Sequence, residues 1–235
     1  MLMADPTRVL IVADGDLDAP LLRELAAGPE RPFVIAADGG AARAEMAGVR
    51  PDIVIGDFDS LADADRDRLA REGVELRPAR VDKDESDMEL CLLAALEAGA
   101  THITVLGALG LVRPEHSVAN LLLLADPRLD GQAVVIVGRG SRLQRCGTAA
   151  GPGVATIDGR PGDFVSLFPL GDAVEGVTAR GLRFPLVDET LPLGPSRGLS
   201  NELLERRAHV TTRRGRLLVI HTSRSTADTP ATGGP

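Results

Sequence analysis

The sequence has neither tryptophan nor tyrosine, and phenylalanine occurs only five times in 235 residues. Positive charge is also in deficit, because 34 Asp and Glu outnumber 26 Lys and Arg and give a formal net charge of −8. An acidic surface repels the phosphate backbone of DNA and RNA. These shortages argue against a general nucleic-acid-binding protein, and they require any phosphate ligand to be bound through a metal ion or through local backbone groups.

Cysteine is nearly absent as well. Cys91 and Cys146 are the only two, and they lie far apart and outside any Cys-x-x-Cys or Cys/His pattern. Neither a zinc site nor a disulfide framework is indicated, so both are expected to be small buried residues. No apolar run approaches the roughly 18 residues of a membrane span, and the N-terminus lacks the pattern of a signal peptide. We therefore expect no membrane partner and a cytoplasmic location.

The common nucleotide-binding fingerprints are missing too. No Gly-x-x-x-x-Gly-Lys-Ser/Thr motif occurs, and Lys83 is the only lysine. The stretch Gly138-Arg139-Gly140 lacks the rest of a dinucleotide motif. A P-loop ATPase and a classical NAD enzyme are both disfavoured.

What the first 138 residues do contain is an alternation of short apolar runs and helical segments. The runs predict strands, and the segments between them predict helices. The expected strands are 8–13, 32–37, 53–56, 74–76, 102–106 and 133–137, and the expected helices are 19–27, 40–46, 61–72, 86–98 and 117–125. This pattern is typical of a parallel α/β sheet, whose ligands lie beyond the carboxyl ends of the strands. We expect residues 1–138 to form one domain.

Residues 139–222 have a different texture, with short β-type runs broken by Gly, Pro and Asp. Such runs predict a small antiparallel sandwich or barrel. Expected strands cover 155–157, 164–168, 174–179, 208–212 and 216–221, and Arg213-Arg214-Gly215 is expected to be the turn of the last hairpin. Residues 223–235 are rich in Ser, Thr, Gly and Pro, and we expect a disordered tail.

The most informative stretch is Gly56-Asp57-Phe58-Asp59-Ser60, which follows the third expected strand. In an extended segment, residues i and i+2 point the same way, so Asp57 and Asp59 would share one side while Phe58 enters the core. Two such carboxylates suit a hard cation, typically Mg²⁺ held together with substrate phosphate oxygens. A polar loop after a strand is the alternative, since Asp and Ser are ordinary turn residues.

Two further clusters lie at similar places. Asp38-Gly39-Gly40 stands between a strand and a helix, an arrangement that brings backbone N–H groups close to a phosphate or simply forms a tight turn. Asp84 and Asp87 lie at a predicted helix start, where Ser86 and Glu89 have the spacing of a capping box. If these acids join Asp57 and Asp59, the cluster needs a cation.

These motifs, in this order, together resemble the thiamine pyrophosphokinase family. The matching blocks are 37–41, 56–60, 83–87, 107–116 and 119–121, followed by 165–170, 181–186 and 198–202 in the β-rich part. The resemblance implies a two-domain homodimer that uses ATP and Mg²⁺ to transfer a pyrophosphoryl group to the hydroxyl of thiamine, releasing AMP. Its active sites would lie between subunits.

The resemblance also implies roles for individual residues. Asp57, Asp59 and Asp87 would be catalytic metal ligands, and Glu115 would be a fourth catalytic residue. The implied nucleotide-binding residues are Asp38, Gly39, Gly40, Asp84, Ser86, Gly107, Arg113, His116 and Asn120. The implied thiamine-binding residues are Phe184, Ser200 and Asn201.

Two departures from the family pattern leave alternatives open. The family loop Gly-Gly-Arg-x-Asp-His is here replaced by residues 110–116, in which Glu115 stands for the Asp and Pro114 removes an N–H. Phe184 stands where the family commonly has Trp, and either ring can stack on a flat heterocycle. The alternatives are a related pyrophosphokinase for another heterocyclic alcohol, such as a pterin, and a catalytically weakened thiamine- and nucleotide-binding protein.

Overall fold

The structure is a computed structural model that describes residues 8–28, 30–58, 61–80, 82–110 and 112–227. The chain divides into two compact units. The first contains the described residues up to Leu123 together with Gly131–Gly138. The second contains Leu124–Asp130 and the described residues from Arg139 onward.

The first unit is built on parallel strands, as the sequence predicts. In spatial order they run β6-β5-β1-β2-β3-β4, and each neighbouring pair is parallel. Their bounds are β1 Arg8–Val12, β2 Phe33–Ala37, β3 Ile53–Gly56, β4 Glu75–Pro78, β5 His102–Leu106 and β6 Ala133–Gly138. The central strands are continuous apolar runs, because both faces of a doubly covered parallel sheet are buried.

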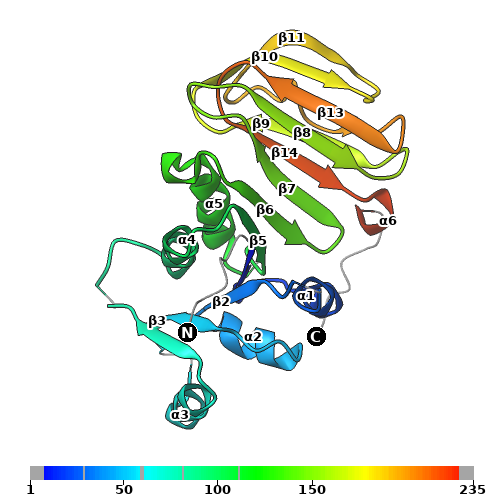
Figure 1. Cartoon of the computed structure of the whole chain (residues 1–235). Coiled ribbons are helices and arrows are strands. Elements are labelled where there is room, and N and C mark those ends of the chain that lie inside the picture. Colours follow the sequence, from blue (N-terminus) through cyan, green and yellow to red (C-terminus); the bar gives the residue numbers. More distant parts are fainter. Residues whose placement is uncertain (1–7, 29, 59–60, 81, 111, 228–235) are drawn as a thin grey trace. The chain divides into compact units, whose positions relative to one another are not determined.

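Helices cover both faces of this sheet. Their bounds are α1 Ala19–Ala26, α2 Gly40–Met46, α3 Asp63–Arg71, α4 Asp87–Glu97 and α5 Pro114–Leu122. Figure 1 shows α1 and α2 on one side of the strands and α4 on the other, and α4 packs against β1, β2 and β3. Because the chain adds β2, β3 and β4 on one side of β1 and then β5 and β6 on its other side, the order reverses between β1 and β5. In open α/β sheets, ligands bind outside the carboxyl ends of the strands at such a reversal.

Helix α5 corrects one boundary. We expected a helix over 117–125, but α5 begins at Pro114 and ends at Leu122, and a 3₁₀ turn covers Leu123–Ala125. Proline is favoured at the first helical position, since its missing N–H has no partner there in any case. As a result Glu115 and His116 belong to the first turn of α5 and not to the preceding loop.

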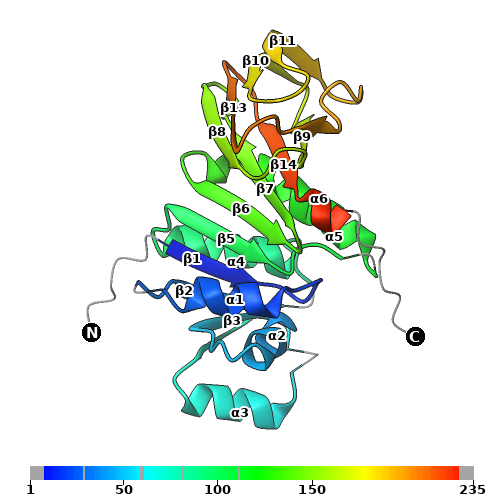
Figure 2. The same ribbon diagram turned by 90° about the vertical axis from the view of Figure 1, so that its right-hand side faces the viewer.

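The second unit is a small antiparallel sandwich. Its strands are β7 Ser141–Cys146, β8 Gly153–Asp158, β9 Phe164–Pro169, β10 Ala173–Arg180, β11 Leu186–Pro192, β12 Asn201–Glu202, β13 Arg207–Thr212 and β14 Leu217–Thr222. Within this unit, one set of neighbours runs β12-β9-β14-β7 and the other runs β11-β10-β13-β8 (Figure 2). Alternate residues such as Ile157, Leu167, Val210 and Val219 form one buried cluster, as two facing sheets require.

Two sequence predictions for this unit are wrong. Arg213–Gly215 is not a hairpin turn, because β13 pairs with β8 and β10 while β14 pairs with β7 and β9. The stretch crosses from one sheet to the other. Residues 224–227, which we expected to be disordered, form the short helix α6 (Arg224–Ala227). The Arg224 N–H donates to the buried Asp163 carboxylate at 3.0 Å, which fixes this end of the chain.

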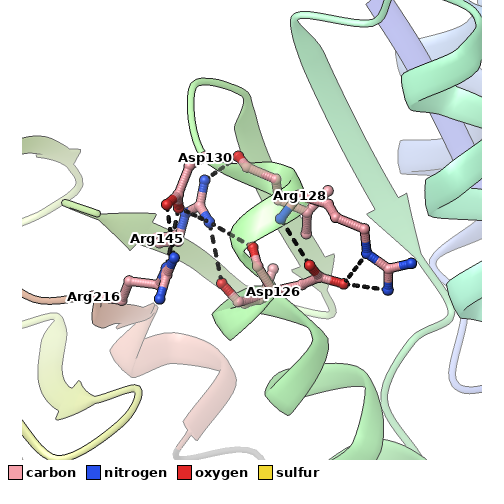
Figure 3. A network of polar contacts seen from close by, with 7 residues as sticks. Asp126, Arg128, Asp130, Arg145 and Arg216 are labelled. Atoms are coloured by element: carbon pink, nitrogen blue, oxygen red, sulfur yellow. Dashed lines mark hydrogen bonds and ion pairs between the residues drawn. The ribbon is translucent and has the colours of Figure 1, made fainter. Parts of the chain in front are cut away.

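The segment Leu124–Asp130, which precedes β6, is held by a charged network (Figure 3). Arg216 donates two hydrogen bonds to Asp130, at 3.0 and 2.7 Å, from the start of β14. Arg145 of β7 donates to Asp130 at 3.0 Å and also to the Leu129 carbonyl. Its side chain is only 5% exposed, and burial lowers its pKa. This segment is thus tied to two strands of the sandwich.

Both cysteines are buried, as expected, and burial raises the pKa of the Cys146 thiol to about 11. Among the described residues, no helix is both long and apolar enough to cross a bilayer.

Candidate functional site

The candidate residues of the first unit gather at the carboxyl edge of its sheet. Asp14 follows β1, Asp38 follows β2, Asp57 follows β3 and Gly107 follows β5. Backbone hydrogen bonds join the loops after β1 and β5, since the Gly15 N–H donates to the Gly107 carbonyl at 2.8 Å. Parallel register brings these strand ends to one edge. The fold therefore brings the strand ends that carry the predicted residues to one edge of the sheet.

The glycines at this edge are explained by close packing. A Cβ on Gly40 would lie 2.1 Å from the Val12 carbonyl oxygen, and one on Gly39 would lie 2.9 Å from the Asp14 carboxyl carbon. Gly107 has φ +70°, and its Cβ would lie 2.2 Å from the Ala13 carbonyl oxygen. A side chain at Gly40 or Gly107 would push the backbone apart, whatever ligand the loops bind, whereas one at Gly39 would displace the exposed Asp14 side chain.

Asp57 is partly exposed at the end of β3, and Phe58 is buried in the core as predicted. The extended geometry that we assumed is wrong, however, because Phe58 has φ +61°. The chain therefore turns sharply right after Asp57. Asp59 lies outside the described residues. Asp38, with φ +37°, lies across from Gly56, the residue before Asp57, since its Cβ lies 2.7 Å from where Gly56 would carry one.

Asp87 begins helix α4, and its carboxylate accepts a hydrogen bond from Lys83 Nζ at 2.7 Å. The side chain of Lys83 is only 16% exposed. Ser86 is the N-cap and accepts from the Glu89 N–H at 3.2 Å, which confirms its predicted capping role. Asp84 is exposed. The only lysine of the chain is thus placed beside one of the predicted metal ligands.

Residues around the start of α5 form two groups. Arg113 donates to Glu115 at 2.6 Å, and this hydrogen bond holds the pKa of Glu115 below its usual value. His116 lies next to the same carboxylate and is exposed. In contrast, the Asn120 amide donates to the Ala108 carbonyl at 2.8 Å. Asn120 therefore holds the loop that Gly107 begins, while Arg113, Glu115 and His116 are accessible to a ligand.

No three His, Cys, Asp or Glu side chains converge as a metal site within the residues that the structure describes. Asp59 is not among them, so the predicted set of Asp57, Asp59 and Asp87 lies partly outside the described residues. Asp57 and Asp87, the two predicted ligands that the structure describes, carry the carboxylate oxygens that suit Mg²⁺.

In the second unit, Phe184 and Asn201 are brought into direct contact. The Asn201 side chain is buried, and its Oδ1 accepts from the Phe184 N–H at 3.0 Å while its Nδ2 donates to the Phe184 carbonyl at 2.6 Å. Ser200 has φ +55°, and its N–H donates to Ser166 at 3.1 Å. The Phe184 residue itself is 54% exposed. Asn201 thus holds the backbone of an accessible ring.

Sequence reasoning missed one pair at the sheet edge. Arg43 of α2 donates from Nε to Asp14 Oδ1 at 2.9 Å, and both side chains are substantially exposed. The pair places a guanidinium beside the Asp38 loop, where a phosphate ligand needs positive charge. The available signal was the Asp14-Gly15-Asp16 stretch after β1, which resembles the other strand ends.

One hollow on the described residues lies away from this edge. It has a volume of about 490 Å³ and is lined by Arg23, Ala26, Ala27, Arg31, Gly48, Val49 and Arg50. These residues precede β2 and β3, so the hollow lies at the amino edge of the sheet. Arg31 is bound to Asp52, and Arg50 donates to the Glu72 carbonyl. We assign the candidate site from chemistry and topology, and not from this hollow.

An open, doubly wound parallel sheet with acidic and glycine-rich loops at its carboxyl edge defines a class of α/β proteins that bind ligands at that edge. Here that sheet accompanies a β sandwich. Residues 28–136 match the thiamin pyrophosphokinase catalytic domain, and residues 155–217 match the thiamin pyrophosphokinase vitamin B1 binding domain. The chain belongs to the thiamine pyrophosphokinase family.

Individual relatives agree with this assignment. Thiamine pyrophosphokinase from Bacillus subtilis is 26% identical over 195 residues, which are 83% of this chain and 89% of that protein. The crystal structure of the Bacillus subtilis thiamine pyrophosphokinase has a TM-score of 0.79 at 25% identity and covers 92% of this chain and 99% of its own. The Geobacillus thermodenitrificans structure has a TM-score of 0.77 at 30% identity, with 93% and 99% covered.

Proposed function

We propose that this protein transfers the pyrophosphoryl group of ATP to the hydroxyl of thiamine, giving thiamine diphosphate and AMP. The observation that carries the proposal is that a catalytic-domain family model matches the first unit, while a vitamin B1-binding family model matches the second. The catalytic-domain match covers the parallel sheet from β2 onward, and the vitamin B1-binding match covers most of the sandwich that presents Phe184.

Transfer at phosphorus mainly requires that the reacting groups be positioned and that charge be neutralised. We assign Asp57, Asp59 and Asp87 to hold Mg²⁺, which when bound neutralises phosphate charge. Lys83 sits 2.7 Å from Asp87 and limits the repulsion among the acids before metal and nucleotide arrive.

The remaining edge residues are assigned to the nucleotide. Asp38, Gly39, Gly40, Asp84, Ser86 and Gly107 border its phosphates or ribose from the loops, and Arg113, His116 and Asn120 border it from α5. Glu115 is kept deprotonated by Arg113, because that hydrogen bond lowers its pKa. A deprotonated carboxylate can accept a hydrogen bond from the thiamine hydroxyl and orient it.

For thiamine we assign Phe184, Ser200 and Asn201. Phe184 offers the ring, because a cationic heterocycle is attracted to a π face. Asn201 fixes the backbone of Phe184 through two hydrogen bonds. Ser200 adjoins Asn201 in a left-handed conformation that is costly for a residue with a side chain, and such conformations concentrate at functional sites.

The proposal also includes a homodimer, a requirement for ATP and Mg²⁺, and a cytoplasmic location. Support for these comes from the resemblance to the family.

The direct test is to incubate the purified chain with ATP, Mg²⁺ and thiamine and to quantify AMP and thiamine diphosphate. We expect equal amounts of the two products and no reaction in the presence of a chelator. Thiamine binding without AMP release would instead identify a binding protein. AMP release only with a hydroxymethylpterin would identify a different acceptor.

A further inference from the structure

Phe184 already has a cation beside its ring. The guanidinium carbon of Arg183 lies 5.6 Å from the ring centroid, within the range of a cation–π contact. Phe184 is nonetheless 54% exposed, so a ligand can still reach the ring. A ligand with a fixed positive charge that binds against this ring would therefore lie close to the positive charge of Arg183.

Glu202 is the carboxylate that holds this guanidinium. Its Oε2 accepts from Arg183 Nη1 at 3.3 Å, and its Oε1 accepts from Arg224 Nη2 at 3.2 Å. The Arg183 N–H also donates to the Glu202 carbonyl at 2.9 Å. The Glu202 side chain is 27% exposed, so its charge is less screened by water than that of a freely exposed group.

Arg224 is fixed independently of Glu202. Its Nε donates to the Gly162 carbonyl at 2.8 Å, and its guanidinium carbon lies 4.7 Å from the Phe164 ring centroid. Its backbone N–H donates to Asp163, which also contacts His221 at 3.0 Å. Arg224 is therefore held in place by several contacts, and Glu202 contacts the guanidinium groups of both Arg183 and Arg224.

Removing the charge of Glu202 would leave Arg183 uncompensated beside Phe184. Two like charges a few ångströms apart repel, and near a protein surface water and salt screen this repulsion only in part. A cationic ligand would meet this repulsion, whereas a neutral ligand of the same shape would not.

We propose that Glu202 is a specificity-determining residue, which offsets Arg183 and so allows a ligand with a permanent positive charge, such as a thiazolium, to bind against Phe184. This inference rests on the proposed function, because it takes Phe184 as the surface that receives thiamine. It adds that selection for the charge of the ligand comes from Glu202, the carboxylate that pairs with Arg183.

The test compares two ligands on the full chain by calorimetric titration. One is thiamine, and the other is its neutral isostere in which a thiophene ring replaces the thiazolium. We expect Glu202→Gln to weaken thiamine binding roughly tenfold. This loss of affinity should be smaller at about 0.5 M salt, because salt screens the repulsion between the charges. We expect binding of the neutral isostere to change less than about twofold, since it carries no charge to repel.

Glu189→Gln is the matched control, because Glu189 also pairs with a partly exposed arginine of the second unit, Arg197, at 2.9 Å. It should leave thiamine affinity unchanged. The double variant Arg183→Met/Glu202→Gln should recover most of the lost thiamine affinity, because the uncompensated cation is then gone. Recovery of thiamine affinity in the double variant also tests the role of Glu202 if the neutral isostere binds too weakly to titrate.

Equal weakening of both ligands by Glu202→Gln, or no rescue by Arg183→Met, would overturn the proposal and leave Glu202 a structural residue that holds the Arg224 segment. A melting curve of each variant separates loss of folding from loss of binding. A wild-type chain that forms no thiamine diphosphate would contradict the proposed function. An active wild type whose Glu202→Gln variant binds thiamine and the neutral isostere as the wild type does would contradict only the role of Glu202.

Discussion

At the scale of single residues, backbone strain coincides with the candidate site. Among the described residues other than glycine, four have positive φ: Asp38, Phe58, Asp188 and Ser200. Asp38 and Ser200 are predicted ligand contacts, and Phe58 separates the two predicted metal ligands. Such conformations cost of order 1–3 kcal/mol each and persist where the surrounding structure enforces them. The strain supports placing function at these three loops.

A first residue-scale prediction concerns the metal ligands. Asp57→Asn should lower turnover about 100-fold, since a lost ligand charge removes a strong transition-state interaction. Asp82→Asn is the control, because Asp82 is an exposed acid paired with Arg80 in the loop before α4. Steady-state rates with saturating ATP and Mg²⁺ provide the measurement. Near-normal activity in the Asp57 variant would remove Asp57 from the metal site.

A second residue-scale prediction concerns pH and Asp163. Burial raises the pKa of Asp163, but hydrogen bonds from the Arg160 and Arg224 N–H groups and from His221 together outweigh burial, so its net pKa is lowered. The charged carboxylate therefore stabilises the fold above its unfolded pKa of about 3.9, and this stability is lost as pH falls through the lower, folded pKa.

Asp163→Asn should accordingly cost about 1.5–3 kcal/mol at pH 7. Denaturant unfolding at pH 7 and near pH 3 would measure it, and the gap between variant and wild type should narrow at the lower pH. A gap that stays constant with pH would show that the charge of Asp163 contributes nothing.

At the scale of elements, helices and strands could be predicted from the sequence where the residue pattern of a segment alone determines its secondary structure. Apolar runs predicted β1, β2, β3, β5 and β6, and Ser86 predicted the start of α4. Strand β7 was missed, because within Ser141–Cys146 only Leu143 and Cys146 are buried and two arginines interrupt the run.

Which strands pair with each other, and which distant side chains meet, could not be predicted from local sequence. Arg213–Gly215 has the composition of a turn, but only the pairing of β13 and β14 with different strands shows that it crosses between sheets. The Arg43–Asp14 pair joins residues 29 positions apart and leaves no periodic signal. The site was predictable as a set of strand ends, whereas the left-handed turn at Phe58 and the Lys83–Asp87 contact depend on tertiary packing.

An element-scale prediction tests the packing of α2 on β1. Gly40→Ala should destabilise the protein by about 1–3 kcal/mol, because its Cβ would overlap the Val12 carbonyl oxygen and force a backbone shift. Gly28→Ala is the control, since the nearest atom to its Cβ would be 4.0 Å away. Thermal melting of both variants gives the comparison. Equal melting temperatures would refute the packing explanation of this glycine.

Another element-scale prediction concerns the segment before β6. Asp130→Asn should cost about 3 kcal/mol, because it leaves the buried guanidinium groups of Arg145 and Arg216 without their carboxylate. Asp158→Asn removes an exposed partner of Arg207 and should cost less than about 1 kcal/mol. Urea unfolding of the two variants measures the difference. A cost for Asp130→Asn no larger than the control would show that the network is not stabilising.

At the scale of the whole molecule, the second unit leaves considerable apolar surface uncovered. Six large apolar residues in it are more than half exposed: Val154, Phe184, Val187, Leu193, Leu199 and Leu204. Single exposed apolar residues are normal, but an uncovered group on one small unit is a feature of surfaces that bind a partner. We propose that this partner is a second copy of the chain.

The last prediction is that the protein is a homodimer at micromolar concentration, joined largely through the second unit. Association that removes these apolar side chains from water is favourable by roughly 25 cal/mol for each square ångström buried, and a stable interface needs more than about 1,000 Å² in total. Sedimentation equilibrium should give twice the mass of 24.6 kDa. Val187→Asp should shift the equilibrium toward monomer, while Val112→Asp, a still more exposed valine of the first unit, should not. A wild-type chain that sediments as a monomer while it is fully active would contradict the prediction.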